Sequence, residues 1–351
     1  MNQTTFAYTP ASINTKPLTD HNRLGLDYHA EADQLSFAAP IWDAHSHINT
    51  PDSARTFLKV MDLYNIEKVW SMTQLENLPA LRDIFGERIE FIAVPNYYAK
   101  DEPDTFTIDW YNRIEKFADF GVKIAKFWAA PRAVDFLPGF DIQSPGYKKG
   151  MHIARDTGMM FMTHIGDPDT WFATHYKDTE KYGSKSSHRQ SLEDLLNEFS
   201  DIPWIAAHMA GNPEHLNTLT QLLIDHPNLY IDTSATKWMI RELSKQPRAE
   251  LLTFLEQFPD RVFFGSDIVT DDNHGADEFD LYASRYWALR TLWETAYAGP
   301  SPIVDPDLHL VDPSQPENAT AHLQGQSVPA STLQNLYHDA AKNFFANIYT
   351  T

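Results

Sequence analysis

Ile41-Trp42-Asp43-Ala44-His45-Ser46-His47 is the most informative segment of this sequence. Its apolar start predicts a β-strand that ends at or just before the two histidines. Side chains at positions i and i+2 of a strand share a face, so both imidazoles can point into one cavity. Neutral imidazole is a common ligand of transition metals, and the pair could therefore hold one ion. Two surface histidines would give the same His-x-His pattern, so a metal site requires further ligands downstream.

The composition limits the class of protein. The chain has 351 residues, 42% hydrophobic and 13% aromatic, which is enough to bury a large core. Lys and Arg number 28 against 48 Asp and Glu, and the net charge of -20 disfavours nucleic-acid and membrane partners. The absence of cysteine excludes disulfides, thiolate metal sites and a cysteine nucleophile. Without a signal-peptide pattern or a membrane-spanning apolar run, we expect a cytoplasmic protein.

Short apolar runs of strand type recur along the chain, and amphipathic helical stretches lie between them. Strands that alternate with helices imply parallel pairing through right-handed crossovers. Eight such units predict an α/β protein with a (β/α)8 TIM barrel rather than an open sheet, and no glycine-rich nucleotide-binding loop follows any run. The runs are Ile41–Ala44, Lys68–Met72, Ile89–Val94, Val122–Phe127, Met159–Thr163, Trp204–Ala207, Leu229–Ile231 and Val262–Phe264.

The chain divides into an N-terminal arm and one barrel domain. Residues 1–38 have few periodic apolar positions and are expected to form the arm, and residues 39–351 form the barrel. The eighth unit is irregular, because a proline-rich and polar segment at about 299–330 separates its helix from the last helix, 332–347. We interpret this segment as an insertion that packs near the barrel mouth.

Further residues of metal-binding type stand where the predicted strands end. Active sites of such barrels gather at the C-terminal ends of the strands. The fifth run leads into His164, the sixth into His208 and the eighth into Asp267. Each residue alone could be an ordinary hydrogen-bonded structural residue. Together with His45 and His47, they form a set of nitrogen and oxygen donors suited to zinc or a similar divalent ion.

This arrangement resembles the amidohydrolase superfamily, whose members carry Asp-x-His-x-His on the first strand, His on the fifth and sixth, and Asp on the eighth. The short segments that flank these residues resemble the amidohydrolase-related branch of the superfamily. This branch includes aminocarboxymuconate-semialdehyde decarboxylase, related aromatic-acid decarboxylases and hydrolases. The likeness covers roughly residues 40–350 and does not specify a substrate. The segments are Thr163-His164-Ile165-Gly166, Ala207-His208-Met209-Ala210-Gly211 and Phe264-Gly265-Ser266-Asp267.

The resemblance implies one divalent metal ion as cofactor, with zinc as the first expectation and manganese or another divalent ion as alternatives. Its ligands would be His45, His47, His164 and Asp267. His208 or Asp267 would act as the catalytic base when a metal-activated water attacks a carbonyl. Asp43 would orient a ring nitrogen of one of these histidines or cap the turn.

Lys126 ends the fourth run and raises the question of a second ion. In binuclear members of the superfamily, a carbamylated lysine on this strand bridges two metals. Lys126 is the expected occupant of that position, with Lys123 as the alternative. Without carbamylation, the ammonium of Lys126 would face Asp267 or a substrate anion.

Candidate substrate-binding residues lie just beyond the strand ends. Arg132 and Arg241 are placed to clamp a carboxylate, because guanidinium binds carboxylate bidentately. Trp128, Trp171 and Trp238 could wall the pocket. Each arginine could equally be a salt-bridge partner, and each tryptophan could fill the core. These residues predict a small carboxylated substrate of aromatic or lactone type.

Three functions are compatible with these residues. The main expectation is a metal-dependent hydrolase that uses a metal-activated water. The alternative is a non-oxidative, metal-dependent decarboxylase that acts on a similar acid with the same ligands. The third is a non-catalytic metal-binding barrel, which is disfavoured because structural zinc sites are usually closed and assembled locally. The expected partner is a small-molecule substrate, and the arm and insertion could make homo-oligomer contacts.

Overall fold

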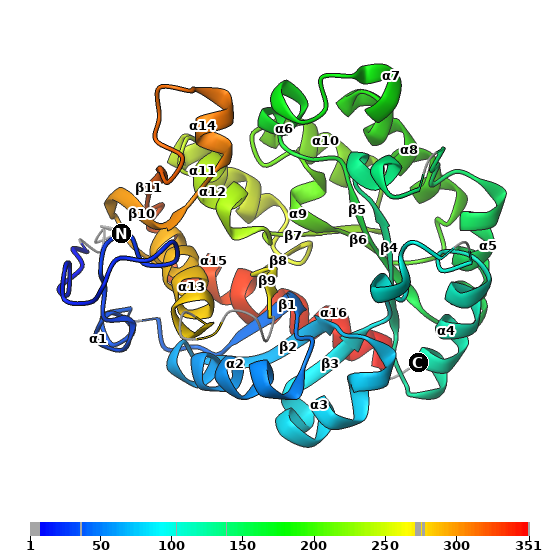
Figure 1. Ribbon diagram of the computed structural model, residues 1–351, viewed down its shortest axis with the longest axis horizontal. Coiled ribbons are helices and arrows are strands. Elements are labelled where there is room, and N and C mark those ends of the chain that lie inside the picture. Colours follow the sequence, from blue (N-terminus) through cyan, green and yellow to red (C-terminus); the bar gives the residue numbers. More distant parts are fainter. Residues whose placement is uncertain are drawn as a thin grey trace.

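The structure is a computed structural model that describes residues 8–35, 37–102, 104–137, 139–270, 275 and 278–349. Parallel strands lie at its centre, and helices surround them (Figure 1). Each predicted run overlaps one strand, with shifts of up to three residues at the ends. The first strand does not end before the two histidines, as expected, but continues through His47. The strands are β1 Ile41–His47, β2 Ile66–Met72, β3 Ile89–Ile92, β4 Ile124–Ala129, β5 Met160–Ile165, β6 Trp204–Ala206, β7 Leu229–Asp232 and β8 Val262–Phe263.

Backbone hydrogen bonds close these strands into a barrel. The strands form two parallel ladders, β3-β2-β1-β9 and β4-β5-β6-β7-β8, in which β9 is the short strand Ile268–Val269. The Lys126 N–H donates to Ala93 O at 2.8 Å and joins β4 to the end of β3. At the other seam, the Ala44 N–H donates to Phe264 O at 2.9 Å. The predicted α/β (β/α)8 barrel is therefore confirmed.

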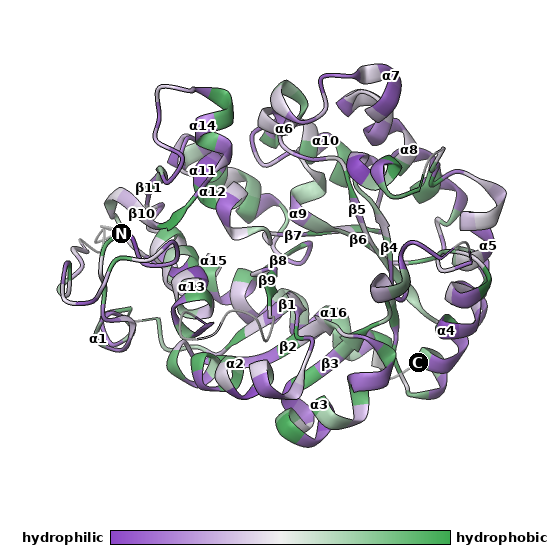
Figure 2. Ribbon diagram, viewed as in Figure 1, coloured by the Kyte–Doolittle hydropathy of each residue, from purple (hydrophilic) through white to green (hydrophobic). Residues whose placement is uncertain are grey.

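The outer helices follow from capping signals and amphipathic spacing. For example, the Thr50 side chain accepts from the Ser53 N–H, and Pro51 stands in the first turn of its helix. Polar and apolar residues alternate along these helices, as expected where one side packs on the strands (Figure 2). The helices are α2 Pro51–Leu63, α3 Leu78–Phe85, α4 Ile108–Asp119, α5 Pro145–Asp156, α8 Lys185–Glu198, α10 Leu216–Asp225, α12 Arg248–Gln257 and α16 Ala340–Tyr349.

The helix α13 (Glu278–Glu294) is buried on most sides because it lies between the barrel and the chain's N-terminal residues. The described part of the predicted arm contains α1 (Tyr28–Ala32) and packs against α13. The Trp287 Nε1–H donates to Tyr8 Oη at 2.9 Å, and the Tyr8 hydroxyl donates to Glu31 at 2.5 Å. Residues 1–7 and 36 of this segment lie outside the described residues.

The segment after α13 forms an antiparallel pair, β10 (Ala298–Val304) and β11 (Thr320–Gln324), with α14 (Asp307–Val311) between the two strands. This pair packs on α13 and on α11 (Thr236–Leu243), the short helix that follows β7. The remaining short helices are α6 Asp169–Thr174, α7 Thr179–Tyr182, α9 Ala207–Ala210 and α15 Ala330–Gln334. None of the described helices is both long and apolar enough to cross a membrane.

Candidate active site

A pocket of about 530 Å³ opens where the strands end and the βα loops begin. Strand ends supply its imidazoles and carboxylate, and loops and helices supply most of its aromatic and cationic side chains. Its lining residues are His45, His47, Met72, Tyr97, Lys100, Phe106, Lys126, Trp128, Phe136, His164, His208, Ala235, Thr236, Lys237, Trp238, Asp267 and Arg285.

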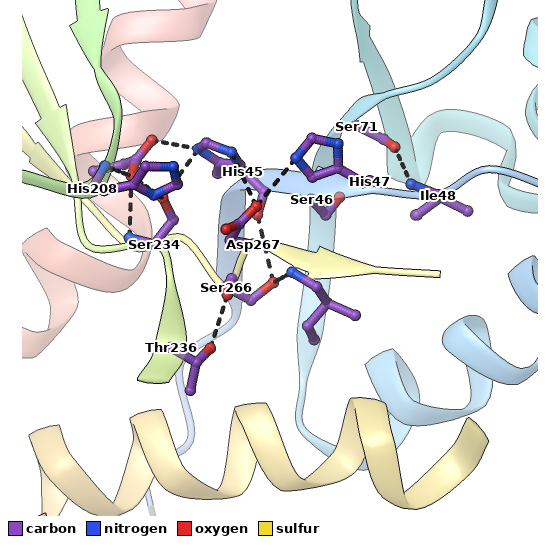
Figure 3. A network of polar contacts seen from close by, with 12 residues as sticks. His45, Ser46, His47, Ile48, Ser71, His208, Ser234, Thr236, Ser266 and Asp267 are labelled. Atoms are coloured by element: carbon purple, nitrogen blue, oxygen red, sulfur yellow. Dashed lines mark hydrogen bonds and ion pairs between the residues drawn. The ribbon is translucent and has the colours of Figure 1, made fainter. Parts of the chain in front are cut away.

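Imidazole nitrogens and one carboxylate converge at the floor of this pocket (Figure 3). Asp267 Oδ1 lies 3.1 Å from His47 Nε2 and 3.4 Å from His45 Nε2. A ring nitrogen of His208 lies within 4.8 Å of ligand atoms of His45 and Asp267. Donors bound at about 2.0–2.2 Å from one ion are about 3–4 Å apart, so this set fits a single divalent ion.

The backbone after β6 turns sharply and directs His208 into the pocket. His208, Met209, Ala210 and Gly211 have φ values of 57°, 51°, 52° and 68°, which form a left-handed turn. This conformation costs about 1–2 kcal/mol for each non-glycine residue, so its neighbours must hold it. The Gly211 N–H donates to His208 O at 3.0 Å, and the His208 N–H donates to Asp232 Oδ1 at 2.9 Å.

Asp232, at the end of β7, orients the metal-facing histidines and was not among the predicted site residues. It is fully buried, and its Oδ2 lies 2.8 Å from His45 Nδ1. Ser234 Oγ bonds Asp232 and lies 2.7 Å from His208 Nδ1. A carboxylate that accepts a hydrogen bond from the Nδ1–H of an imidazole leaves the lone pair of Nε2 free to bind a metal. The sequence signal that could have identified Asp232 is its position directly after the seventh apolar run, Leu229–Ile231.

We expect Asp232→Asn to weaken binding of a divalent ion by about 10–100-fold, because an amide no longer fixes the tautomer and basicity of His45. Competition with a fluorescent chelator measures this affinity. The same substitution at Asp156, an exposed residue that ends α5, is the matched control. Unchanged affinity in Asp232→Asn would contradict the orienting role.

Asp43 takes the second of its two expected roles: it caps backbone N–H groups and does not contact a histidine ring. Its Oδ1 accepts from the backbone N–H groups of His45 at 3.1 Å and Ser266 at 3.0 Å. Its Oδ2 accepts from the hydroxyls of Ser266 at 2.6 Å and Tyr286 at 2.7 Å. Asp43 therefore ties β1 to the loop that carries Asp267, and the ring contact belongs to Asp232. Burial raises the pKa of Asp43 to about 6.

The charges at the cluster follow from burial and contact. Burial acts to raise the pKa of Asp267, but hydrogen bonds from His45 and His47 outweigh it and hold the pKa well below its usual range. Burial, together with the neighbouring His164, holds the pKa of the His208 imidazole well below its usual range. At neutral pH the site therefore presents a carboxylate and a neutral imidazole, both suited to bind a cation.

His164 lines the pocket but has a carboxylate partner of its own. Its Nε2 lies 2.7 Å from Asp167 Oδ1, and Asp167 also accepts from the Tyr176 hydroxyl at 2.6 Å. The His164 and His208 rings are 4.5 Å apart, centroid to centroid. The structure thus groups His208, the expected base, with His45 and Asp267, and it places the expected ligand His164 beside them.

Lys126 reaches the pocket from β4, as its position in the fourth run predicted. Only 3% of the residue is exposed, and Nζ has no hydrogen-bond partner among the described residues. Burial lowers the pKa of Lys126 to about 8, although Asp232 and Asp267 act in the opposite direction. Lys123, the alternative occupant, does not line the pocket.

The expected arginine clamp does not form. Arg241 is buried, and its Nη1 donates to Asp305 at 2.7 Å and to Asp307 at 3.1 Å. Arg132 is exposed and lies against the Phe136 ring, 5.5 Å from its centroid, outside the pocket lining. The chain is rich in carboxylates, and the ion pairs of Arg241 with two of them leave its guanidinium unavailable to a substrate.

Two of the three predicted tryptophans lie at the pocket. Trp128 and Trp238 line the pocket. Trp171 does not, because its Nε1–H donates to Asp307 at 2.7 Å, and it meets Trp238 edge to face at 5.2 Å. The cations that do line the pocket, besides Lys126, are Lys100, Lys237 and Arg285, and none of these three was predicted.

A (β/α)8 barrel with imidazoles and a carboxylate clustered at its strand ends is the architecture of metal-dependent barrel enzymes. The chain belongs to the amidohydrolase family, whose sequence model matches residues 111–345, more than half of the chain. The resemblance expected from the motifs is therefore confirmed at family level. No curated protein matches the chain in sequence.

The chain is similar to several solved structures at low sequence identity. An uncharacterised TIM-barrel protein from Bordetella bronchiseptica is 11% identical, with a TM-score of 0.50 over 88% of this chain and 99% of the other. A 5-carboxyvanillate decarboxylase from Novosphingobium aromaticivorans, complexed with manganese, is 10% identical, with a TM-score of 0.48 over 89% and 97%. A probable 2-pyrone-4,6-dicarboxylic acid hydrolase from Acinetobacter baumannii is 13% identical, with a TM-score of 0.44 over 72% and 92%.

Proposed function

We propose that this protein is a metal-dependent, non-oxidative decarboxylase of small aromatic acids. The character of the pocket lining carries the proposal. Five aromatic side chains and four cations surround a single carboxylate, that of Asp267, among the described residues that line the pocket. Such a lining suits a flat ring that bears negative charge. The aromatic residues are Tyr97, Phe106, Trp128, Phe136 and Trp238, and the cations are Lys100, Lys126, Lys237 and Arg285.

One divalent ion would be held by His45, His47 and Asp267, with His208 or His164 completing the set. These nitrogen and oxygen donors suit zinc first and manganese as well. When bound, the ion would supply Lewis-acid stabilisation of a substrate oxygen. Lys126 would not be needed as a bridge to a second ion. Its Nζ, which has no hydrogen-bond partner among the described residues, would be available to a substrate carboxylate.

The residues around the ion would hold the substrate and move one proton. The aromatic walls would hold the ring and exclude water, which strengthens the contacts between the carboxylate and the cations. When the bond from ring to carboxylate breaks, its electron pair stays on the ring carbon, CO2 leaves, and that carbon takes a proton. Asp267 and His208 are the groups at the floor of the pocket that could carry this proton from solvent to the carbon.

Hydrolysis, the main expectation from the sequence, is the second candidate. It is favoured by the proximity of His208 to Asp267, because either group could accept a proton from an attacking water. We prefer decarboxylation because Lys126 lines the pocket with the cluster and its Nζ, which has no hydrogen-bond partner among the described residues, could hold the leaving carboxylate. A purely structural metal site is disfavoured, since a strained turn at His208 and an unpartnered buried lysine lower stability.

The test is a panel of hydroxybenzoates, aminobenzoates and benzene dicarboxylates, given to the metal-loaded protein in D2O. We expect CO2 release and a product with one deuterium on the ring carbon that lost the carboxylate. A parallel panel of lactones, esters and amides in ¹⁸O-water tests hydrolysis. Incorporation of ¹⁸O by the second panel, without CO2 release from the first, would overturn the proposal in favour of hydrolysis. Unchanged turnover in His208→Asn would remove His208 from the chemistry.

A further inference from the structure

We propose that the helices α11 and α13, which follow β7 and β9, form a subsite for a second anionic group of the substrate, a carboxylate or phosphate oxyanion. Lys237 and Arg285 would bind it, and the N-terminus of α11 would support them. This inference rests on the proposed function, since it concerns the same pocket. It narrows the substrate class to aromatic acids that carry two anionic groups, one at the metal-facing floor and one at this subsite.

Arg285 comes from α13 and lacks an acidic partner among the described residues. Its Nη1 donates to Ser284 Oγ at 2.9 Å and lies 3.2 Å from His21 Nδ1. No carboxylate of the described residues lies within ion-pair distance of its guanidinium. Burial lowers the pKa of Arg285 to about 10, so it remains a cation at neutral pH. A guanidinium in this state is a ready partner for an oxyanion.

Lys237, the second residue of α11, is in the same situation. The nearby carboxylates Asp305 and Asp307 make their ion pairs with Arg241, not with Lys237. Burial and the charge of neighbouring Arg285 lower the pKa of Lys237. Two cations that face one pocket repel each other, and an anion placed between them removes this cost.

The contrast with Arg241 shows why this absence of partners matters. In a chain with 48 acidic and 28 basic residues, a carboxylate is available for most interior cations. Arg241, one helical turn after Lys237, bonds Glu242, Asp305 and Asp307. Lys237 and Arg285 line the pocket, and neither makes such a bond to a described carboxylate. An anionic ligand is the natural partner of a pair of this kind.

The start of α11 adds a third contribution. The helix begins at Thr236 after Ala235, whose φ is 66°, and no side chain caps its N-terminus. The Thr236 hydroxyl donates instead to Ser266 O at 2.8 Å, which ties this end of the helix to the loop of Asp267 (Figure 3). Thr236, Lys237 and Trp238 all line the pocket. Many TIM barrels bind phosphate between the loops after strands 7 and 8 and the N-terminus of a short extra helix.

Binding measurements on the metal-loaded protein test this subsite without relying on turnover. The probes are benzoate, with one anionic group, and two probes with two groups each, isophthalate and 3-phosphonobenzoate. We expect wild type to bind one of the two-group probes at least about tenfold more tightly than benzoate, and the tighter of the two identifies the oxyanion. Lys237→Gln and Arg285→Gln should each bind the tighter two-group probe about ten- to hundredfold more weakly than wild type. Both variants should bind benzoate as tightly as wild type.

Lys245→Gln is the matched control, because this exposed lysine just after α11 carries the same charge outside the pocket. It should leave both affinities unchanged, and Lys237→Arg should retain most of the binding of the two-group probe. Equal affinity of wild type for all three probes would overturn the subsite. Equal losses for benzoate and the two-group probe in the variants would do the same. If no panel acid is decarboxylated but the selective losses occur, the proposed reaction fails and the subsite stands.

Discussion

Asp267→Asn will weaken binding of a divalent ion by at least about 100-fold and abolish turnover. Asp267 Oδ1 is the atom on which His47 Nε2 and His45 Nε2 converge, at 3.1 and 3.4 Å. Asparagine keeps the shape but removes the negative charge that the two histidines hold in place. Loss of an outer partner of a metal ligand already costs about 10–100-fold, so loss of the ligand's charge costs at least as much.

Competitive chelator titration measures this affinity, and the acids of the panel measure turnover. Asp260→Asn is the control, because Asp260 is exposed and stands just before β8, at the opposite end of the strand that leads to Asp267. Its affinity should equal that of wild type. Retention of wild-type metal affinity by Asp267→Asn would show that the cluster is not the metal site.

Gly211→Ala will lower the free energy of unfolding by about 3 kcal/mol. Gly211 has a φ of +68°, and a Cβ there would lie 2.5 Å from the backbone C and O of Gly166 and 2.8 Å from the Asp167 N. The strained backbone costs about 1–2 kcal/mol, and overpacking against backbone atoms costs about 1–3 kcal/mol more. Gly211 closes the turn of His208, so the affinity for metal should fall as well. Urea denaturation measures the stability.

The control for this prediction is Gly158→Ala. Gly158 has a φ of +78°, but nothing lies within 4 Å of the added Cβ, so this substitution carries the backbone strain alone. It should cost about 1–2 kcal/mol. Equal losses in the two variants would contradict the close approach of the loops after β5 and β6, on which the positions of His164 and His208 depend.

The strands could be predicted because parallel strands buried on both faces appear as continuous apolar runs. The predicted runs Met159–Thr163 and Trp204–Ala207 are largely of this kind, and each leads into a histidine. The two-residue strand β9 could not be predicted, because its bonds to Ser46 and His47 exist only once the barrel has closed. The left-handed turn at His208 was also hidden, since Met209 and Ala210 are not residues that favour positive φ.

The cluster of imidazoles and a carboxylate at the pocket floor could be predicted because a strand's direction fixes which end its last residue occupies. The substrate residues depend on side chains that approach from elsewhere in the chain. Arg241 was expected either to bind substrate or to form a salt bridge, and the second holds because Asp305 and Asp307 reach it from the segment between β10 and β11. Arg285 was not among the predicted site residues, because only the packing of α13 beside the pocket gives it a role.

The most direct test of the central claim is the metal content of the purified protein, measured by inductively coupled plasma mass spectrometry. The protein is loaded with zinc or manganese and then desalted. The geometry at His45, His47, His208 and Asp267 predicts one divalent ion per wild-type chain and almost none in Asp267→Asn. A wild-type protein that retains no divalent ion after loading would contradict the metal site, and with it both proposed reactions.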